Sequence, residues 1–288
     1  MKITREVTDI IDPIYVMEGA GVRLRRSIAT QKLDYLDPFL LFDHFGSVDA
    51  EDYLAGFPMH PHRGIETVTY LLDGLVNHRD SMGNSGTLEK DDVQWMTSGS
   101  GIIHEEMPKP DKGKMEGFQL WVNLPAKLKM TSPRYQEVKS SKIPEIRLEN
   151  GVIVKIIAGE MDGVHGAVIE IFADPMYLDV NMPRKSYFEQ PIKRGHTVFV
   201  YVFEGEGIFG DFEEESSEMG TAVSSTEMVI FGDGDYIKVK TEQNFVRFLL
   251  ISGKPLNEPI ARYGPFVMNT SEEIEQALID LRTDNFVK

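Results

Sequence analysis

Cysteine is absent from this 288-residue chain, and histidine is scarce, with seven copies in all. The lack of cysteine excludes disulfide bonds, thiolate metal ligands and a cysteine nucleophile. A bound metal ion must therefore be held by histidine, aspartate, glutamate or water. The same absence fits a reducing compartment.

Long apolar runs are also missing. The longest, such as residues 198–203, fall far short of the roughly 18 apolar residues that cross a bilayer. The first residues are charged and lack the apolar core of a signal peptide. We therefore expect a cytoplasmic protein, or a nuclear one in a eukaryote, that has no membrane partner.

Positive charge is in the minority, because 30 lysines and arginines face 46 aspartates and glutamates, a formal net charge of −16. An acidic chain repels phosphate backbones and no dense basic run is present, so we expect no direct binding to nucleic acid. The hydrophobic fraction of 41% and the charged fraction of 26% are ordinary for a globular protein and exclude a disordered one.

Glycine and proline, 25 and 15 residues, divide the chain into short segments rich in β-branched and aromatic residues. Many short strands separated by turn residues are typical of an all-β sandwich or barrel. The predicted strands include residues 66–72, 152–157, 167–172, 198–203, 228–231 and 245–251.

A short C-terminal helix is predicted in addition. Thr270 and Glu273 have the spacing of a capping box. The apolar residues that follow recur at helical spacing on one face: Ile274, Ala277, Leu278 and Leu281.

The chain also contains an internal repeat. Residues 64–74 resemble residues 195–205, with matching glycines at both ends, a shared tyrosine and an acidic residue before the second glycine. A repeat of this length indicates two copies of one β domain. The linker is expected at residues 139–151, which gives domains at 1–140 and 141–288.

Three of the seven histidines fall in two short segments. His60 and His62 flank Pro61, and in an extended strand they present two imidazoles on one face, which Glu66 shares. Two neighbouring imidazoles can chelate a divalent transition metal. In the second segment, His104 and Glu106 also share a face. Two adjacent strands would gather three histidines and one carboxylate, and strand parity leaves both Glu66 and Glu106 open as the fourth ligand.

The second copy of the repeat lacks this pattern. At the same spacing His60 corresponds to Pro191 and His62 to Lys193. Only His165 and His196 remain in that half, and neither belongs to a pair. We expect no metal in the C-terminal domain.

These histidine segments resemble the two cupin motifs and, more narrowly, the sequence resembles the pirin family of two-cupin proteins. Gly99-Ser100-Gly101 precedes the second-motif histidine, where most cupins have Pro-x-Gly and pirins allow the variation. The matching segments are residues 37–45, 60–68, 94–97, 101–104, 119–125 and 264–270.

The resemblance implies an all-β fold with two cupin-type antiparallel β-barrel (jelly-roll) domains facing each other, followed by the short C-terminal helix. It implies that one metal ion, Fe(II), is bound in the N-terminal domain. The implied ligands are His60, His62, His104 and Glu106, which places Glu66 behind them. Nitrogen and oxygen ligands also suit Mn, Co, Ni, Cu or Zn.

Pirins are similar in activity to quercetinases, which open the ring of a flavonol with O2 and release carbon monoxide. For this chain the resemblance implies a quercetin 2,3-dioxygenase-like oxidoreductase in which Glu106 is the catalytic base for the flavonol 3-hydroxyl. Asp43, His44 and Gln119 are candidates for orienting the ligands. Trp95 and Trp121 are expected to pack in the core.

Two other interpretations stay open at this point. Pirins also resemble iron-dependent co-regulators, which act on transcription factors or metabolic enzymes through protein contacts and without turnover. The second interpretation is a monomeric metalloprotein whose natural substrate is not a flavonoid. An enzyme requires an apolar cavity beside the metal that is large enough for a three-ring flavonol, whereas a regulator requires only the metal and a responsive surface.

Overall fold

The structure, a computed structural model, describes residues 2–109, 114–212 and 220–287. The chain forms two units, each made of two separate stretches of sequence. The first unit contains Ile14–Ser140 and Leu256–Lys288, and the second contains Met1–Pro13 and Ser141–Pro255. The units differ from the predicted domains 1–140 and 141–288, because each includes the terminal segment that the prediction assigned to the other.

The first unit consists of antiparallel strands in two sheets and a C-terminal segment. The larger sheet has the order β12-β9-β6-β11-β4-β3-β2, and the smaller has the order β5-β10-β7-β8. The larger sheet comprises β2 (Ile14–Glu18), β3 (Val22–Ile28), β4 (Phe39–Ser47), β6 (Ile65–Asp73), β9 (Val93–Thr97), β11 (Met115–Asn123) and β12 (Arg134–Val138). The smaller comprises β5 (Phe57–His62), β7 (Val76–Asp80), β8 (Ser85–Leu88) and β10 (Ile102–Pro108).

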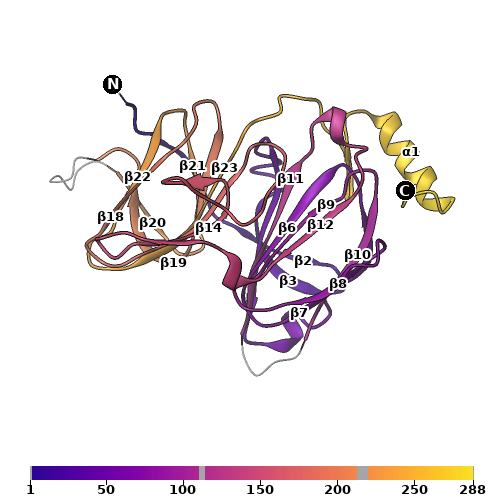
Figure 1. Cartoon of the computed structure of the whole chain (residues 1–288), viewed down its shortest axis with the longest axis horizontal. Helices are drawn as coiled ribbons and strands as arrows, with labels where there is room; N and C mark the ends of the chain where they lie inside the picture. The colour runs from indigo at the N-terminus through magenta and orange to yellow at the C-terminus, as the bar shows by residue number, and fades with distance from the viewer. Residues whose placement is uncertain (1, 110–113, 213–219, 288) are drawn as a thin grey trace. The chain divides into compact units, whose positions relative to one another are not determined.

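The C-terminal segment of the first unit contains the hairpin β24 (Ala261–Tyr263) and β25 (Phe266–Met268), followed by the helix α1 (Ser271–Arg282). The predicted capping box is confirmed, because the Thr270 hydroxyl oxygen accepts from the Glu273 backbone and the Glu273 carboxylate accepts from the Thr270 backbone. Ile274 and Ala277 are buried against β25, and Leu278 and Leu281 pack beside them. The helix therefore covers the first unit, and Figure 1 shows it in yellow beside β10.

Two buried cations attach this C-terminal segment to the remainder of the first unit. The Lys129 ammonium donates to the backbone oxygens of Gly64 and Val267, at 2.9 and 2.8 Å. Arg63 donates to Asp280 of α1 at 2.8 Å and lies over the Phe286 ring. The turn that follows His62 is thus fixed directly to the end of the chain.

The second unit is one ten-stranded antiparallel sheet with a small hairpin. The main path is β1-β21-β19-β23-β17-β14-β13, and β18, β20 and β22 join it through the long strand β19. The sheet comprises β1 (Val7–Ile11), β13 (Glu145–Arg147), β14 (Ile153–Ala158), β17 (Met176–Met182), β18 (Tyr187–Pro191), β19 (Thr197–Phe209), β20 (Thr221–Ser224), β21 (Met228–Phe231), β22 (Tyr236–Lys240) and β23 (Val246–Gly253). The hairpin pairs β15 (Glu160–Met161) with β16 (Val164–His165).

The start of the chain is held in the second unit by β1 and by a buried arginine. β1 pairs with β21, and Figure 1 shows the indigo start of the chain beside β21 and β22. The Arg5 guanidinium donates to the backbone oxygens of Lys193, His196 and Gly232. A single continuous core of valine, leucine, isoleucine and phenylalanine fills this unit.

The repeat found in the sequence corresponds to equivalent strands of the two units. β6 lies between β9 and β11, and β19 lies between β21 and β23. Gly64, Gly74, Gly195 and Gly205 all have positive φ angles, between 75° and 94°. Gly64 and Gly74 flank β6 and Gly195 precedes β19, whereas Gly205 lies inside β19, just after an irregularity in its pairing with β23.

Five of the six strand segments predicted above are confirmed, and one is wrong. Residues 167–172 form no strand. Glu170, Ala173 and Asp174 instead have positive φ angles, which interrupt an extended backbone. The β-branched residues Val168 and Ile169 suggested a strand, but the chain turns here before β17 begins at Met176.

Candidate metal centre

β5 and β10 place three imidazoles together. His60 and His104 lie directly opposite each other in the antiparallel pair, with ring centroids 4.4 Å apart. His62 follows on the same face of β5, 4.8 Å from the His60 ring and 5.1 Å from the His104 ring. Pro61 is tolerated because β5 is an edge strand, where its missing N–H leaves no ladder bond unmade.

The pairing is irregular on the side of β5 that precedes His60. Glu106 lies opposite Phe57, so β5 carries one more residue than β10 between the two pairs. Such a bulge re-aims side chains and is common beside active sites. The Pro58 carbonyl within the bulge accepts a hydrogen bond from His60 Nδ1 at 2.9 Å, so Nε2 is the nitrogen that the neutral His60 ring can offer to a metal.

The buried ring nitrogens of this cluster fit a metal ion. Each histidine offers one nitrogen, and these nitrogens lie within 4.8 Å of one another. Among the described residues, Nδ1 of His62 and both ring nitrogens of His104 have no hydrogen-bond partner although they are buried. Buried polar atoms are normally satisfied, so the unused nitrogens of His62 and His104, gathered with His60, fit a bound metal ion.

Burial also favours the neutral imidazole that a metal needs. Desolvation holds the pKa of His62 and of His104 well below the usual value, and the neighbouring histidines lower it further. A hydrogen bond to the backbone at Pro265 opposes the effect at His62. Both side chains can therefore bind a divalent ion without first releasing a proton.

The two candidate carboxylates have different surroundings. Glu106, two residues after His104, lines the same cavity as His60 and His62, and the Thr69 hydroxyl donates to its Oε1 at 2.7 Å. Glu66 is fully buried, accepts from the Thr97 hydroxyl at 2.7 Å and does not line this cavity. The cavity therefore favours Glu106 over Glu66, although neither carboxylate belongs to the three-histidine cluster itself.

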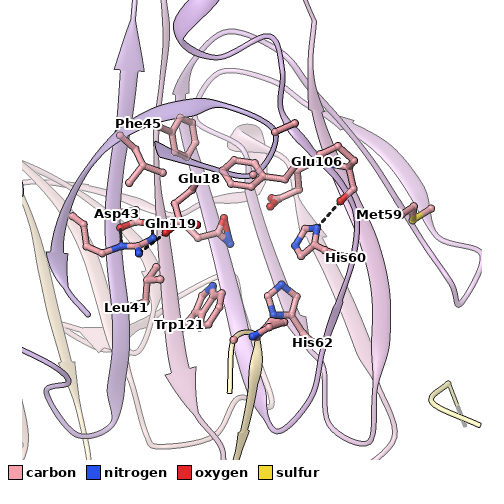
Figure 2. Close-up of a pocket in the computed structure, with 18 of the residues that line it drawn as sticks. Glu18, Leu41, Asp43, Phe45, Met59, His60, His62, Glu106, Gln119 and Trp121 are labelled. Atoms are coloured by element: carbon pink, nitrogen blue, oxygen red, sulfur yellow. Dashed lines mark hydrogen bonds and ion pairs between the residues drawn. The ribbon is translucent and has the colours of Figure 1, made fainter. Parts of the chain in front are cut away.

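A cavity of about 530 Å³ opens beside the histidines within the first unit. Its walls are largely apolar and aromatic, and its charged and imidazole groups stand at two ends (Figure 2). Figure 2 shows His60, His62 and Glu106 on one side, Asp43 and Glu18 on the other, and Gln119 and Trp121 between them. The apolar lining includes Leu24, Leu41, Phe45, Phe57, Met59 and Trp121.

The predicted neighbours of the ligands separate into two groups. Asp43 and Gln119 line the cavity, and Gln119 Oε1 lies 3.2 Å from the Thr69 hydroxyl. His44 does not line it; its Nε2 lies 3.1 Å from Glu116 and its ring packs 4.8 Å from Phe118. Strand alternation explains the difference, because Asp43 and His44 are adjacent on β4 and point to opposite faces.

Trp121 differs from its predicted role as a core residue. Its indole lies edge to face with His62, with ring centroids 5.0 Å apart, and forms a wall of the cavity. Trp95 is buried as predicted, at 1% exposure.

Several side chains of the site were missed by sequence reasoning. Thr69 belongs to a strand that the pattern predicted, but nothing in its spacing links it to Glu106. His78, on β7, stacks on Tyr135 behind His104, with the His78 and His104 ring centroids 5.7 Å apart. Arg262 reaches the cavity from the C-terminal segment. The only available signal for Arg262 was its place just before the predicted segment 264–270.

The two histidines of the second unit lie apart from any such cluster in the described residues. His165 is exposed and lies 3.5 Å from Glu160, whereas His196 lies 3.5 Å from Asp174. In the part of the chain that the structure describes, no helix is long and apolar enough to cross a membrane.

The chain is similar in sequence and in structure to known cupin-type proteins. The pirin family matches residues 21–122, and the pirin C-terminal cupin domain matches residues 177–287. A pirin-like protein of Caulobacter vibrioides is 41% identical over 283 residues, which cover 98% of this chain and 99% of that protein. A Pseudomonas aeruginosa protein provisionally named quercetin 2,3-dioxygenase is also 41% identical, over 96% of both chains.

Among solved structures, a quercetin 2,3-dioxygenase from Acinetobacter baumannii has a TM-score of 0.87 and 33% identity, covering 99% of this chain and 100% of that one. Two cupin-type units, with a three-histidine cluster in one of them, define a two-domain cupin protein. The matches over both units are more specific, and the chain belongs to the pirin family.

Proposed function

We propose that this protein is a quercetin 2,3-dioxygenase-type enzyme that uses Fe(II) to open a flavonol ring with O2. Both oxygen atoms of O2 enter the opened product, and the carbon that carried the 3-hydroxyl leaves as carbon monoxide. The observation that carries the proposal is a cluster of three imidazoles, two of them buried with unused nitrogens, at one wall of a largely apolar cavity. The names of the similar proteins support it.

His60, His62 and His104 would hold the metal, with Glu106 as a fourth ligand. When bound, the metal supplies a Lewis acid that lowers the pKa of a coordinated hydroxyl and a redox centre for O2. Glu106 would accept the proton of the flavonol 3-hydroxyl, and the Thr69 hydroxyl would orient that carboxylate. Trp121 and the apolar walls would hold the flat rings and exclude water.

The cavity favours catalysis over regulation without turnover. A site that only switches a surface does not need an enclosed space, whereas ligand pockets of drug-sized molecules measure roughly 300–1,000 Å³. The volume of about 530 Å³ falls in that range and lies directly beside the histidines. A co-regulator that acts through protein contacts is the alternative if turnover fails.

The test is to load the purified protein with Fe(II) under argon, add quercetin and air, and measure flavonol absorbance together with carbon monoxide. We expect turnover in the wild type and its loss in His60→Ala and Glu106→Gln. Glu66→Gln is the matched control, since it alters a buried glutamate outside the cavity and should retain turnover and metal. A protein with one bound iron that leaves quercetin unchanged would contradict the proposal.

A further inference from the structure

Two arginines stand at the end of the cavity opposite the histidines, and their hydrogen bonds differ. Arg26 donates to both carboxylate oxygens of Asp43, at 2.8 and 2.7 Å, and to Glu18 at 2.6 Å. Its guanidinium is therefore fully engaged with carboxylates, and this group of three side chains needs no further anion.

Arg262 forms no ion pair with any carboxylate in the described residues. Its Nη1 donates to the Leu40 carbonyl at 3.2 Å, and its Nε donates weakly to Gly264 at 3.4 Å. Arg262 is an exposed residue and is one of the side chains that line the cavity. Asp34, Asp43 and Glu18 act on its charge only from longer range, and Asp43 and Glu18 are already bound to Arg26.

Trp121 links this arginine to the metal-binding end. The Arg262 guanidinium carbon lies 5.2 Å from the centre of the Trp121 ring, and the His62 ring lies 5.0 Å from it. A flat ligand that lies along the indole can therefore contact the metal site at one end and Arg262 at the other.

We propose that Arg262 selects substrates that carry an anionic oxygen group, a carboxylate or an acidic phenol, at the end away from the metal. The preferred substrate class is then a flat aromatic acid with a metal-binding hydroxyl. This inference rests on the proposed metal site but requires no particular reaction there.

The chemistry follows from the geometry of a guanidinium. Its planar set of N–H donors matches a carboxylate in two parallel hydrogen bonds, and the Nη2 edge of Arg262 makes no hydrogen bond that competes with them. Glu18, Asp34 and Asp43 bring three negative charges to this end of the cavity against the two positive charges of Arg26 and Arg262. Arg262 is the cation of the two that no described carboxylate pairs with, so it is the group that a ligand anion would meet.

The test compares two catechols that differ only in charge, 3,4-dihydroxybenzoate and the neutral 3,4-dihydroxybenzamide. The protein is loaded with Zn(II), which prevents redox turnover, and each Kd is measured by calorimetry. We expect the benzoate to bind at least about tenfold more tightly to the wild type, which is the size of one charge-assisted pair. Arg262→Met should reduce this ratio to near one while the zinc content stays at one per chain.

Arg23→Met is the matched control, because Arg23 lies on β3 of the same unit, is exposed and does not line the cavity. It should keep the benzoate preference. Equal affinities in the wild type, or a preference that persists in Arg262→Met because the carboxylate binds the metal instead, would overturn the inference. A retained preference with no quercetin turnover would refute only the dioxygenase proposal, and turnover without the preference would refute only the role of Arg262.

Discussion

The Thr69 hydroxyl joins two polar side chains of the cavity, since it lies 2.7 Å from Glu106 and 3.2 Å from Gln119. Thr69→Val keeps the shape of the side chain and removes its hydrogen bonds. A hydrogen bond to a charged group contributes about 1.5 kcal/mol, so we expect kcat for quercetin to fall about tenfold with unchanged iron content. Steady-state kinetics and metal analysis measure both quantities.

The same strand offers a matched control for Thr69. Thr67 is also buried on β6, but its hydroxyl has no hydrogen-bond partner among the described residues, so Thr67→Val should leave kcat unchanged. Thr69→Ser should restore most of the activity. If Thr69→Ser is as slow as Thr69→Val, the residue acts through packing and not by orienting Glu106.

Asp43 predicts a pH dependence of stability. Burial raises the pKa of Asp43 from the usual 3.8 to about 6, although the hydrogen bonds from Arg26 oppose the shift. Between those values the folded protein binds a proton that the unfolded chain does not, so the contribution of Asp43 to stability grows as the pH falls from 6 to 4 and is lost as it rises.

The comparison with Asp43→Asn isolates this proton. The unfolding free energy of the wild type, minus that of the variant, should increase by about 2 kcal/mol between pH 7 and pH 4 in urea titrations. A difference that does not change with pH would mean that the carboxylate stays ionised beside Arg26.

Single residues also mark the limit of sequence reasoning. His60, His62 and His104 could be predicted because alternation along a strand places i and i+2 on one face. Thr69 and Trp121 reach the same cavity through the pairing of distant strands, and Arg262 reaches it from the C-terminal segment. Neither arrangement produces a pattern in the neighbouring sequence. The sequence therefore predicted the three-histidine cluster of the candidate site but not the walls of the cavity beside it.

At the scale of elements, α1 and β5 are joined by a buried ion pair. Arg63, directly after His62, donates to Asp280 of α1 at 2.8 Å, and both side chains are largely buried. Removing one partner of a buried pair leaves an uncompensated charge and costs about 3–5 kcal/mol. Asp280→Asn should therefore lower the free energy of unfolding by that amount and weaken metal binding, because the turn after His62 loses its anchor.

Urea unfolding and metal titration test this link between two elements. Glu275→Gln on the exposed face of the same helix is the control and should change stability by less than about 0.5 kcal/mol. Unchanged metal affinity in a clearly destabilised Asp280→Asn would show that the helix supports the fold but not the site.

The elements were predicted with unequal success for physical reasons. The helix α1 was located because its capping box and apolar face are local signals. Residues 167–172 were wrongly predicted as a strand because their β-branched composition gives no sign of the left-handed backbone at Glu170 and Ala173. The bulge in β5 could not be predicted from the sequence either, since it depends on the pairing of Phe57 with Glu106.

At the scale of the whole molecule, the two units exchange their terminal segments. Composition and the repeat predicted two β domains. The exchange of terminal segments depends on long-range pairing, such as that of β1 with β21, and no change in composition along the chain indicates it. Arg5 is the clearest marker, because it is 1% exposed and donates to three backbone carbonyls of the second unit.

Arg5→Met should therefore destabilise the second unit selectively. Three buried carbonyl oxygens lose their donor, and we expect a loss of about 3 kcal/mol with faster hydrogen exchange in β21 and β22. Exchange in β6 and β11, and the metal content of the first unit after loading, should not change. Hydrogen-exchange mass spectrometry measures this, with the exposed Lys2→Met as control; uniform acceleration in both units would contradict it.

The exchange of segments also sets an order for synthesis on the ribosome. The second unit has all its parts once Pro255 has been made, whereas the first unit, although begun earlier, still lacks Leu256–Lys288. Translation proceeds at about 5–20 residues per second, so many seconds separate the synthesis of the histidine strands from that of Arg262 and Pro265. During that interval the nascent chain has its three imidazoles but not Arg262 and Pro265, which line the finished cavity.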